Sequence, residues 1–104
     1  MKFTFLGTGT SGGVPSLGCS CAVCRSTNPR DKRWRSAALL ETDTTRILID
    51  SGPDIRMQLM PFPFKKLDGV LLTHIHYDHV AGIDDLRPFC VFGDIHVYAN
   101  EQTV

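Results

Sequence analysis

The chain of 104 residues has no excess charge of either sign, because eleven basic and eleven acidic side chains cancel. It therefore lacks the broad basic field by which many nucleic-acid-binding proteins attract phosphate over their whole surface. No apolar run approaches the roughly 20 residues that cross a bilayer. Met1 leads directly into a short strand pattern, without the apolar centre and cleavage site of a signal peptide. These absences predict a cytoplasmic protein that does not contact membranes.

The chain has four cysteines, too few for a disulfide-rich scaffold. In the cytoplasm such residues are expected to be reduced thiols or metal ligands rather than disulfides. Cys19, Cys21 and Cys24 form a C-x-C-x-x-C cluster, one ligand short of a complete structural zinc site. The alternative is three unrelated thiols on a loop, but their density favours metal binding. Cys90 has apolar neighbours and is expected to be a buried core thiol.

The hydrophobic pattern predicts an α/β order of elements. Expected strands cover residues 2–6, 37–41, 46–50, 68–72 and 95–98, with a tight polar link at 42–45. A helix is expected from Pro53 to about Met60, capped by Ser51 or Gly52. Another is expected to begin near Val80 or Asp84 and to end at Phe89.

The most informative segment is residues 73–79, T-H-I-H-Y-D-H, which follows an apolar run. If this segment continues a strand, His74 and His76 point the same way and can bind one ion together. A turn after them would bring Asp78 and His79 towards a second ion. Imidazole and carboxylate ligands suit Zn²⁺, Mn²⁺ or Fe better than Ca²⁺ or Mg²⁺. The alternative is that these are surface histidines near a loop. This is less favoured, because the segment is internal and follows a strand that is expected to be buried.

Residues 7–12 match the pattern G-x-G-x-x-G, but no helical pattern follows them. A dinucleotide fingerprint must open a helix, so nucleotide binding is not expected here. The glycines instead predict a turn that lets backbone pass close to the metal site. A second possibility is that the N–H groups of this turn bind a substrate phosphate oxygen.

The segment T-H-I-H-Y-D-H resembles the H-x-H-x-D-H signature of the metallo-β-lactamase-fold hydrolases. Residues 3–11 and 47–52 resemble openings of that fold, in particular its ribonuclease Z and phosphodiesterase branches. The cysteine cluster, followed by Arg30-Asp31 and Arg35-Ser36, resembles the cyclic-phosphodiesterase branch associated with phosphonate breakdown. Four segments thus match in the right order.

This resemblance implies an α/β fold, the N-terminal half of an αββα sandwich, with a mixed β-sheet and flanking helices. Members of the family are more than twice as long and consist of two similar halves. Residues 1–104 are therefore expected to be the N-terminal part of a single domain. Two later His ligands and a bridging Asp of the family have no counterpart here, which leaves half of a dinuclear site.

For the metal site, the resemblance implies that His74 and His76 hold one zinc ion and that Asp78 and His79 hold the other. Mn²⁺ or Fe could replace zinc at these two positions. Asp78 is also expected to be catalytic, by positioning the attacking hydroxide. Asp50 is expected to orient a metal-binding His through a hydrogen bond, with helix capping as the alternative.

For the cysteine cluster, the resemblance implies a separate structural zinc ion held by Cys19, Cys21, Cys24 and a distant His. That His would lie beyond Val104, or the role would fall to His96.

The function implied is a metal-dependent hydrolase, a phosphodiesterase that uses a metal-activated hydroxide on a small cyclic or ribosyl phosphate. One alternative is a transfer-RNA-processing endoribonuclease of the ribonuclease Z type, which needs a basic arm to grip RNA. Another is a non-catalytic zinc-binding fragment. The 104-residue chain alone is expected to be inactive or impaired. Because half of a sandwich leaves an apolar sheet face uncovered, it is also expected to form homodimers or larger assemblies.

Overall fold

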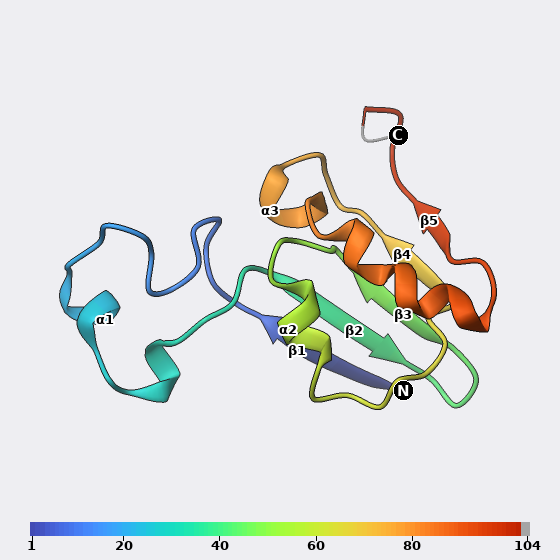
Figure 1. The fold of residues 1–104 in the computed structure, drawn as a ribbon, viewed down its shortest axis with the longest axis horizontal. Helices are drawn as coiled ribbons and strands as arrows, with labels where there is room; N and C mark the ends of the chain where they lie inside the picture. Colours follow the sequence, from blue (N-terminus) through green and yellow to red (C-terminus); the bar gives the residue numbers. More distant parts are fainter. Residues whose placement is uncertain (103–104) are drawn as a thin grey trace.

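The computed structural model, which describes residues 1–102, contains a mixed five-stranded sheet with helices on one face (Figure 1). In sheet order the strands are β1 (Lys2–Gly7), β2 (Ala37–Glu41), β3 (Arg46–Ile49), β4 (Gly69–Leu71) and β5 (His96–Tyr98). The first three strands pair antiparallel, while β4 is parallel to both β3 and β5. The α/β class and the mixed sheet with flanking helices are confirmed.

Two crossovers carry the helices, because parallel neighbours cannot be joined by a tight turn. The first contains α2 (Ile55–Leu59), and the second contains α3 (Tyr77–Val80) and the 3₁₀ helix η2 (Ile83–Phe92). The predicted helix 53–60 starts two residues late, because Pro53 lies in a turn and Asp54 is the N-cap. The other expected helix, from Val80 or Asp84 to Phe89, corresponds to η2, which begins at Ile83 and runs on to Phe92 as a 3₁₀ helix. The short helix α3, inside the histidine motif, was not expected.

The two faces of the sheet differ in what covers them. On one face Leu6, Leu39, Leu48 and Val70 are buried, and they form a core with Ile55 of α2. Since side chains alternate along a strand, their neighbours point to the opposite face. That face is also apolar but is uncovered, and its exposed members are Phe3, Phe5, Leu71 and Tyr98.

Residues 8–36, hereafter the cysteine lobe, project from the end of β1 before the chain returns as β2 (Figure 1). The lobe contains α1 (Ala22–Arg25) and the 3₁₀ helix η1 (Pro29–Asp31). Its base is closed by backbone bridges between Gly9 and Arg35 and between Val14 and Arg33.

Two further sequence expectations concern Cys90 and membrane-spanning segments. Cys90 is exposed, so its assignment to the core was wrong: it lies on a surface turn of η2. Across the described residues, no helix has the length and apolar character needed to cross a membrane.

Candidate metal centre

The histidine motif follows β4 directly but is not part of it. Strand β4 ends at Leu71, so His74 and His76 lie on a loop, and the prediction that they alternate along a strand was wrong. The loop nevertheless brings the rings together. The ring centroid of His74 lies 4.5 Å from that of His76 and 4.1 Å from that of His79, which α3 carries.

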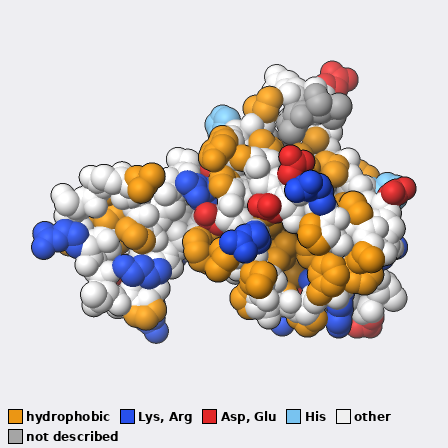
Figure 2. Space-filling view, viewed as in Figure 1, with side chains coloured by type: hydrophobic (Ala, Val, Ile, Leu, Met, Phe, Trp, Pro, Cys, Tyr) orange, Lys and Arg blue, Asp and Glu red, His pale blue; other side chains and the backbone are white. Residues whose placement is uncertain are grey.

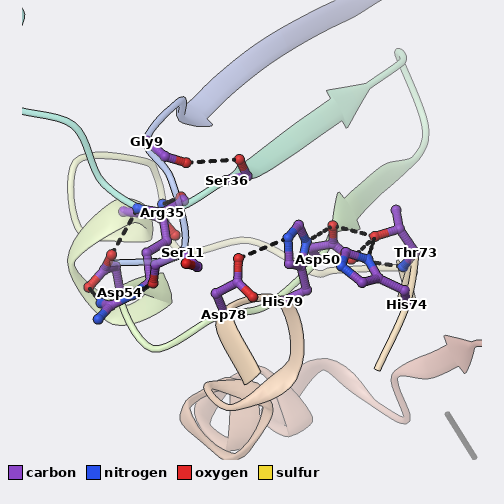
Figure 3. Close-up of polar contacts among 11 residues, drawn as sticks. Gly9, Ser11, Arg35, Ser36, Asp50, Asp54, Thr73, His74, Asp78 and His79 are labelled. Carbon is purple, nitrogen blue, oxygen red and sulfur yellow. Dashed lines mark hydrogen bonds and ion pairs between the residues drawn. The ribbon is translucent and has the colours of Figure 1, made fainter. Parts of the chain in front are cut away.

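One buried carboxylate lies beside this cluster. Asp50, at the end of β3, is 4% exposed, and its Oδ2 lies 2.6 Å from Nδ1 of His79 (Figure 3). A carboxylate can only accept hydrogen bonds, so Nδ1 of His79 carries the hydrogen. In the neutral form of this ring, Nε2 on the opposite side is then the bare nitrogen. This is the contact expected of a carboxylate that orients a metal-binding His.

Asp50 also reaches His74 through Thr73. The hydroxyl of Thr73 lies 2.8 and 3.0 Å from the two carboxylate oxygens of Asp50, and 2.9 Å from Nδ1 of His74. Because its single hydrogen goes to the carboxylate, the hydroxyl oxygen accepts from Nδ1–H of His74. The Nε2 atom of His74 is then bare as well. The same carboxylate thus selects the tautomer of two imidazoles.

The resulting arrangement fits a cation. Oδ2 of Asp78 lies 3.1 Å from Nε2 of His79, so two acceptors face one another. They repel unless a proton or a metal ion lies between them. Two ligands that each lie about 2.0–2.2 Å from one zinc ion are themselves about 3 Å or slightly more apart. Asp78 and His79 therefore already have the spacing of two ligands on one ion.

The backbone of Asp50 is unusual. Its φ of 66° lies in the left-handed region, which costs a non-glycine residue about 1–2 kcal/mol. The N–H of Asp50 donates to Leu71 O at 2.8 Å, and its carboxylate accepts from Thr73 N–H at 2.8 Å. These bonds hold the strained residue in place. Strain of this kind concentrates at functional sites.

Backbone hydrogen bonds join helix α3 to the segment that follows Asp50. Ser51 N–H donates to His79 O at 2.8 Å, and Gly82 N–H donates to Ser51 O at 2.9 Å. A Cβ atom at Gly52 would lie 2.1 Å from Asp78 O, so the two segments touch without room for a side chain. The backbone positions of Asp78 and His79 are therefore set by residues 51–52.

The cysteine cluster is a second candidate site, in the lobe. Among residues 1–102, Cys19, Cys21 and Cys24 are the one set of three or more His, Cys, Asp or Glu residues whose ligand atoms all lie within 4.8 Å of one another. The histidine motif is more open than this. Strand β5, with His96, lies at the opposite end of the molecule from α1 (Figure 1), so His96 does not complete this set within the chain.

The three thiols differ in acidity. A hydrogen bond from Cys24 N–H, followed by those from the thiols of Cys19 and Cys24, lowers the pKa of Cys21 to about 7. The pKa of Cys19 is raised: Cys21 N–H lowers it, but the hydrogen bonds between its thiol and those of Cys24 and Cys21 outweigh this. The cluster thus already favours the thiolate that zinc requires at Cys21.

A cavity of about 240 Å³ adjoins Asp50 on the open side of the sheet. Its wall includes Asp50, from the metal centre, and Thr8 and Ser36, from the two ends of the cysteine lobe. A separate apolar cavity of about 310 Å³ lies between α2 and η2, and none of the histidines lines it. Of these two cavities, the first adjoins both the lobe and the candidate metal centre.

Residues 45–104 match the family model described as the beta-lactamase superfamily domain. The chain belongs to this superfamily. Its fold agrees with a crystal structure of a diphosphatase from the PhnP family, with a TM-score of 0.91 and 44% identity over 97% of this chain. The expectation of a metallo-β-lactamase fold is thereby confirmed.

Further relatives in this superfamily share less of the structure. Zinc-bound PqqB from Methylobacterium extorquens has a TM-score of 0.71 and 25% identity over 96% of this chain, which is 46% of that chain. The short form of human tRNase Z has a TM-score of 0.59 and 30% identity over 83% of this chain, which is 28% of that chain. The chain covers 42% of the diphosphatase. Each matched structure is thus more than twice as long as the matching part.

A curated relative is also much longer. An octanoyltransferase from Porphyromonas gingivalis is 50% identical over 105 residues, which cover all of this chain but 21% of that protein. The match therefore concerns about a fifth of the relative, and its name does not say which part carries the named activity.

Sequence reasoning missed several residues near the centre. Thr73 directly precedes the histidines. Its hydroxyl, next to a cluster of potential metal ligands, is the one local signal by which its role could have been found. Arg35 was noted as part of the family resemblance, but no role followed from it. Asp54 and Gln58, which join the lobe to α2 through Arg35, carried no local signal, because these contacts cross separate parts of the chain.

Proposed function

We propose that the protein to which this chain belongs is a metal-dependent phosphodiesterase whose metal ligands include His74, His76, Asp78 and His79. The observation that carries the proposal is the pair of acceptors formed by Asp78 and His79, held by Asp50. The metal would be Zn²⁺, Mn²⁺ or Fe, because the donors are imidazole and carboxylate. A structural zinc ion at Cys19, Cys21 and Cys24 belongs to the same proposal.

Each residue has a part in this chemistry. Bound metal ions supply Lewis-acid activation of water and neutralise charge at the phosphoryl group. Asp50 keeps Nε2 of His79 directly, and Nε2 of His74 through Thr73, free to act as ligands. Asp78 is the catalytic residue, because its carboxylate lies beside Nε2 of His79 and can accept a hydrogen bond from the attacking water.

The substrate we favour is a small cyclic or ribosyl phosphate ester. Support comes from the C-x-C-x-x-C cluster, whose ligand atoms lie close together, and from the similarity to the PhnP-family diphosphatase. The cavity beside Asp50, with a volume of about 240 Å³, is also of a size that suits a small molecule.

A transfer-RNA-processing ribonuclease is the second candidate. The cysteine lobe carries a net charge of +4, from five cationic side chains and one carboxylate, and it projects from the body of the protein. In Figure 2 it displays blue Lys and Arg side chains and no red on the visible face. This lobe is the candidate for the basic arm that such an enzyme needs to grip RNA. Likeness to human tRNase Z adds weight.

An activity screen separates the two candidates. The full-length gene product, loaded with Zn²⁺ or Mn²⁺, is offered phosphoribosyl cyclic phosphate, cyclic nucleotides and a precursor transfer RNA. We expect turnover of a small cyclic phosphate, and Asp78→Ala should abolish it without unfolding the protein. Asp43→Ala, in the exposed turn after β2, removes the same charge and should leave turnover intact. Normal activity of Asp78→Ala would defeat the assignment.

For the 104-residue chain alone, the third alternative is a zinc-binding module without catalysis. Metal analysis beside the same assay, on this chain and on the full gene product, decides it. Metal in both but turnover in the longer protein alone would support a chain that is impaired by itself.

A further inference from the structure

We infer that Arg35 is a positioning residue, which fixes the cysteine lobe to the metal centre through Asp54. Arg35 lies where the lobe returns to β2, and its backbone N–H and C=O, its Nε and its Nη1 all have partners (Figure 3). Its N–H donates to Oδ2 of Asp54 at 2.9 Å, and its Nη1 donates to Oδ1 of the same carboxylate at 2.9 Å. Its Nε donates to Ser11 O at 2.7 Å, which ties in the first half of the lobe.

Helix α2 lacks the usual N-cap hydrogen bond, because the N-cap side chain binds Arg35. Asp54 is the N-cap residue of α2, yet its side chain accepts no hydrogen bond from the helix. An Asp in that position usually accepts from the second or third helical N–H, which contributes about 1 kcal/mol. Here both carboxylate oxygens bind Arg35 instead. A residue that breaks a local stability rule without local gain points to a role elsewhere.

The next turn of α2 completes the receptor for Arg35. Gln58 follows Asp54 by four positions, so the two side chains lie on the same side of the helix. Gln58 is 4% exposed, and its Nε2 donates to Arg35 O at 2.7 Å. The N–H, C=O and guanidinium of Arg35 are thus all held by α2, which fixes the residue in position and in orientation.

Strand β1 leaves space for the same contact. A Cβ atom at Gly7 would lie 2.0 Å from Arg35 O and 2.5 Å from Nε2 of Gln58. Only glycine allows β1 to end this close to the receptor. The outgoing and returning ends of the lobe therefore both meet at α2.

The receptor is continuous with the metal centre. Asp54 follows the segment 51–52, whose backbone holds Asp78 and His79 in α3. Thr8 and Ser36, at the two ends of the lobe, line the cavity that contains Asp50. Loss of the Arg35 contact should therefore let the cavity wall move while the metal ligands remain in place. Substrate binding would suffer more than the chemical step.

The test compares Arg35→Gln with Arg30→Gln in the full-length gene product. Both variants remove one guanidinium from the lobe, but Arg30 is exposed on η1 and its side chain contacts neither Asp54 nor Ser11. With a cyclic phosphate as substrate, we expect Arg35→Gln to raise KM about tenfold with kcat within about twofold. Arg30→Gln should leave both constants unchanged, and zinc content should be the same in all three proteins. Arg35→Lys, which keeps the charge on Asp54 but not the bond to Ser11, should give an intermediate KM.

Hydrogen exchange gives a readout that does not need activity. The amides of Gly9, Val14 and Arg33 are bonded across the base of the lobe. They should exchange at least tenfold faster in Arg35→Gln, and at the normal rate in Arg30→Gln. If Arg35→Gln does not fold, Asp54→Asn keeps the acceptor for the backbone N–H of Arg35 and should show smaller shifts in the same direction.

The inference rests on the proposed function for its kinetic part alone. If the unmodified protein hydrolyses no phosphate ester, the proposed function fails, and the exchange rates still decide whether Arg35 fixes the lobe. If the protein is active but Arg35→Gln keeps the normal KM and exchange rates, the inference is overturned and the proposed function stands. Equal losses in Arg35→Gln and Arg30→Gln would overturn it too, because they would reflect charge alone.

Discussion

At the scale of single residues, Asp50 links two histidines of the candidate metal centre. Its carboxylate contacts Nδ1 of His79 and the hydroxyl of Thr73, which in turn contacts His74. Since the two imidazoles can bind metal through Nε2 only when Nδ1 carries the hydrogen, one side chain sets the chemistry of both. The positive φ of Asp50 is the backbone strain that accompanies this position.

Replacing Asp50 by Asn should weaken metal binding. In Asp50 one carboxylate oxygen accepts from Thr73 N–H and the other accepts from Nδ1 of His79. An amide has an acceptor oxygen on one side and an NH₂ group on the other, so one of these two donors would face the NH₂ group. We expect the affinity of the histidine motif for Zn²⁺ to fall by about 10–100-fold, measured by calorimetric titration. The exposed Asp43→Asn is the control for loss of charge. An unchanged affinity in Asp50→Asn would show that the imidazoles do not depend on this carboxylate.

The cysteine cluster predicts a pH-dependent reactivity. Because the pKa of Cys21 is lowered to about 7, its reactive thiolate should form in the metal-free chain as the pH rises through 7. Cys19, whose pKa is raised, should react at higher pH. Alkylation by iodoacetamide, followed residue by residue with mass spectrometry from pH 5 to 10, measures both.

The same experiment has a control and an outcome that would contradict the prediction. Added Zn²⁺ should protect all three thiols if they share one ion. Alkylation of Cys19 before Cys21 at pH 7 would contradict the hydrogen-bonding pattern described for the cluster.

At the scale of elements, the contact between residues 51–52 and α3 determines where the motif lies. A Cβ atom at Gly82 would meet Gly52 O at 1.8 Å. The two segments cannot move apart without breaking the backbone hydrogen bond from Ser51 N–H to His79 O. The glycines are thus required by close approach rather than by a turn.

Gly82→Ala should therefore destabilise the fold by about 1–3 kcal/mol, as overpacking does. Urea unfolding followed by circular dichroism measures the free energy of unfolding. Gly12→Ala is the matched control: the nearest atom to its new Cβ is the hydroxyl of Ser16, a side chain that can move. Equal stability of the two variants would mean that the contact with Gly52 relaxes without cost.

At the scale of the whole molecule, both faces of the sheet are apolar, but the helices cover only one of them in the described residues. Phe5 is 72% exposed and Phe3 is 50% exposed on the open face, and their rings pack edge to face. Their cross-strand neighbours on β2 and β3 are also apolar. Patches of this kind drive association in water. We propose that a second copy of the 104-residue chain covers this face when the chain is studied alone.

Sedimentation velocity at micromolar concentrations tests the association. The chain should sediment as a dimer or larger species, and Phe5→Glu should shift it towards monomer. Val91→Glu places the same charge on an equally exposed apolar residue of η2, away from the open face, and should not change the mass. A monomer at high concentration, or equal effects of both variants, would contradict the proposal.

Much of the fold could be predicted from the sequence, because strands are recognised from local alternation. All five expected strands are present within one or two residues, and the polar link 42–45 joins β2 to β3 as expected. Helix starts were less accurate: a turn at Pro53 and Asp54 replaced the expected first residues of α2. The side chain of Asp54, at the N-cap, binds Arg35 rather than its own helix.

The sequence by itself determined the candidate ligands and the class of fold, since the spacing of His74, His76, Asp78 and His79 and the strand periodicity are local properties. Tertiary structure alone decided how they are used. Asp50 meets His79 across 29 positions of the chain, and Arg35 meets Asp54 across 19. Such contacts form only when β3, α2 and α3 pack against one another, because packing fixes the distances that hydrogen bonds require.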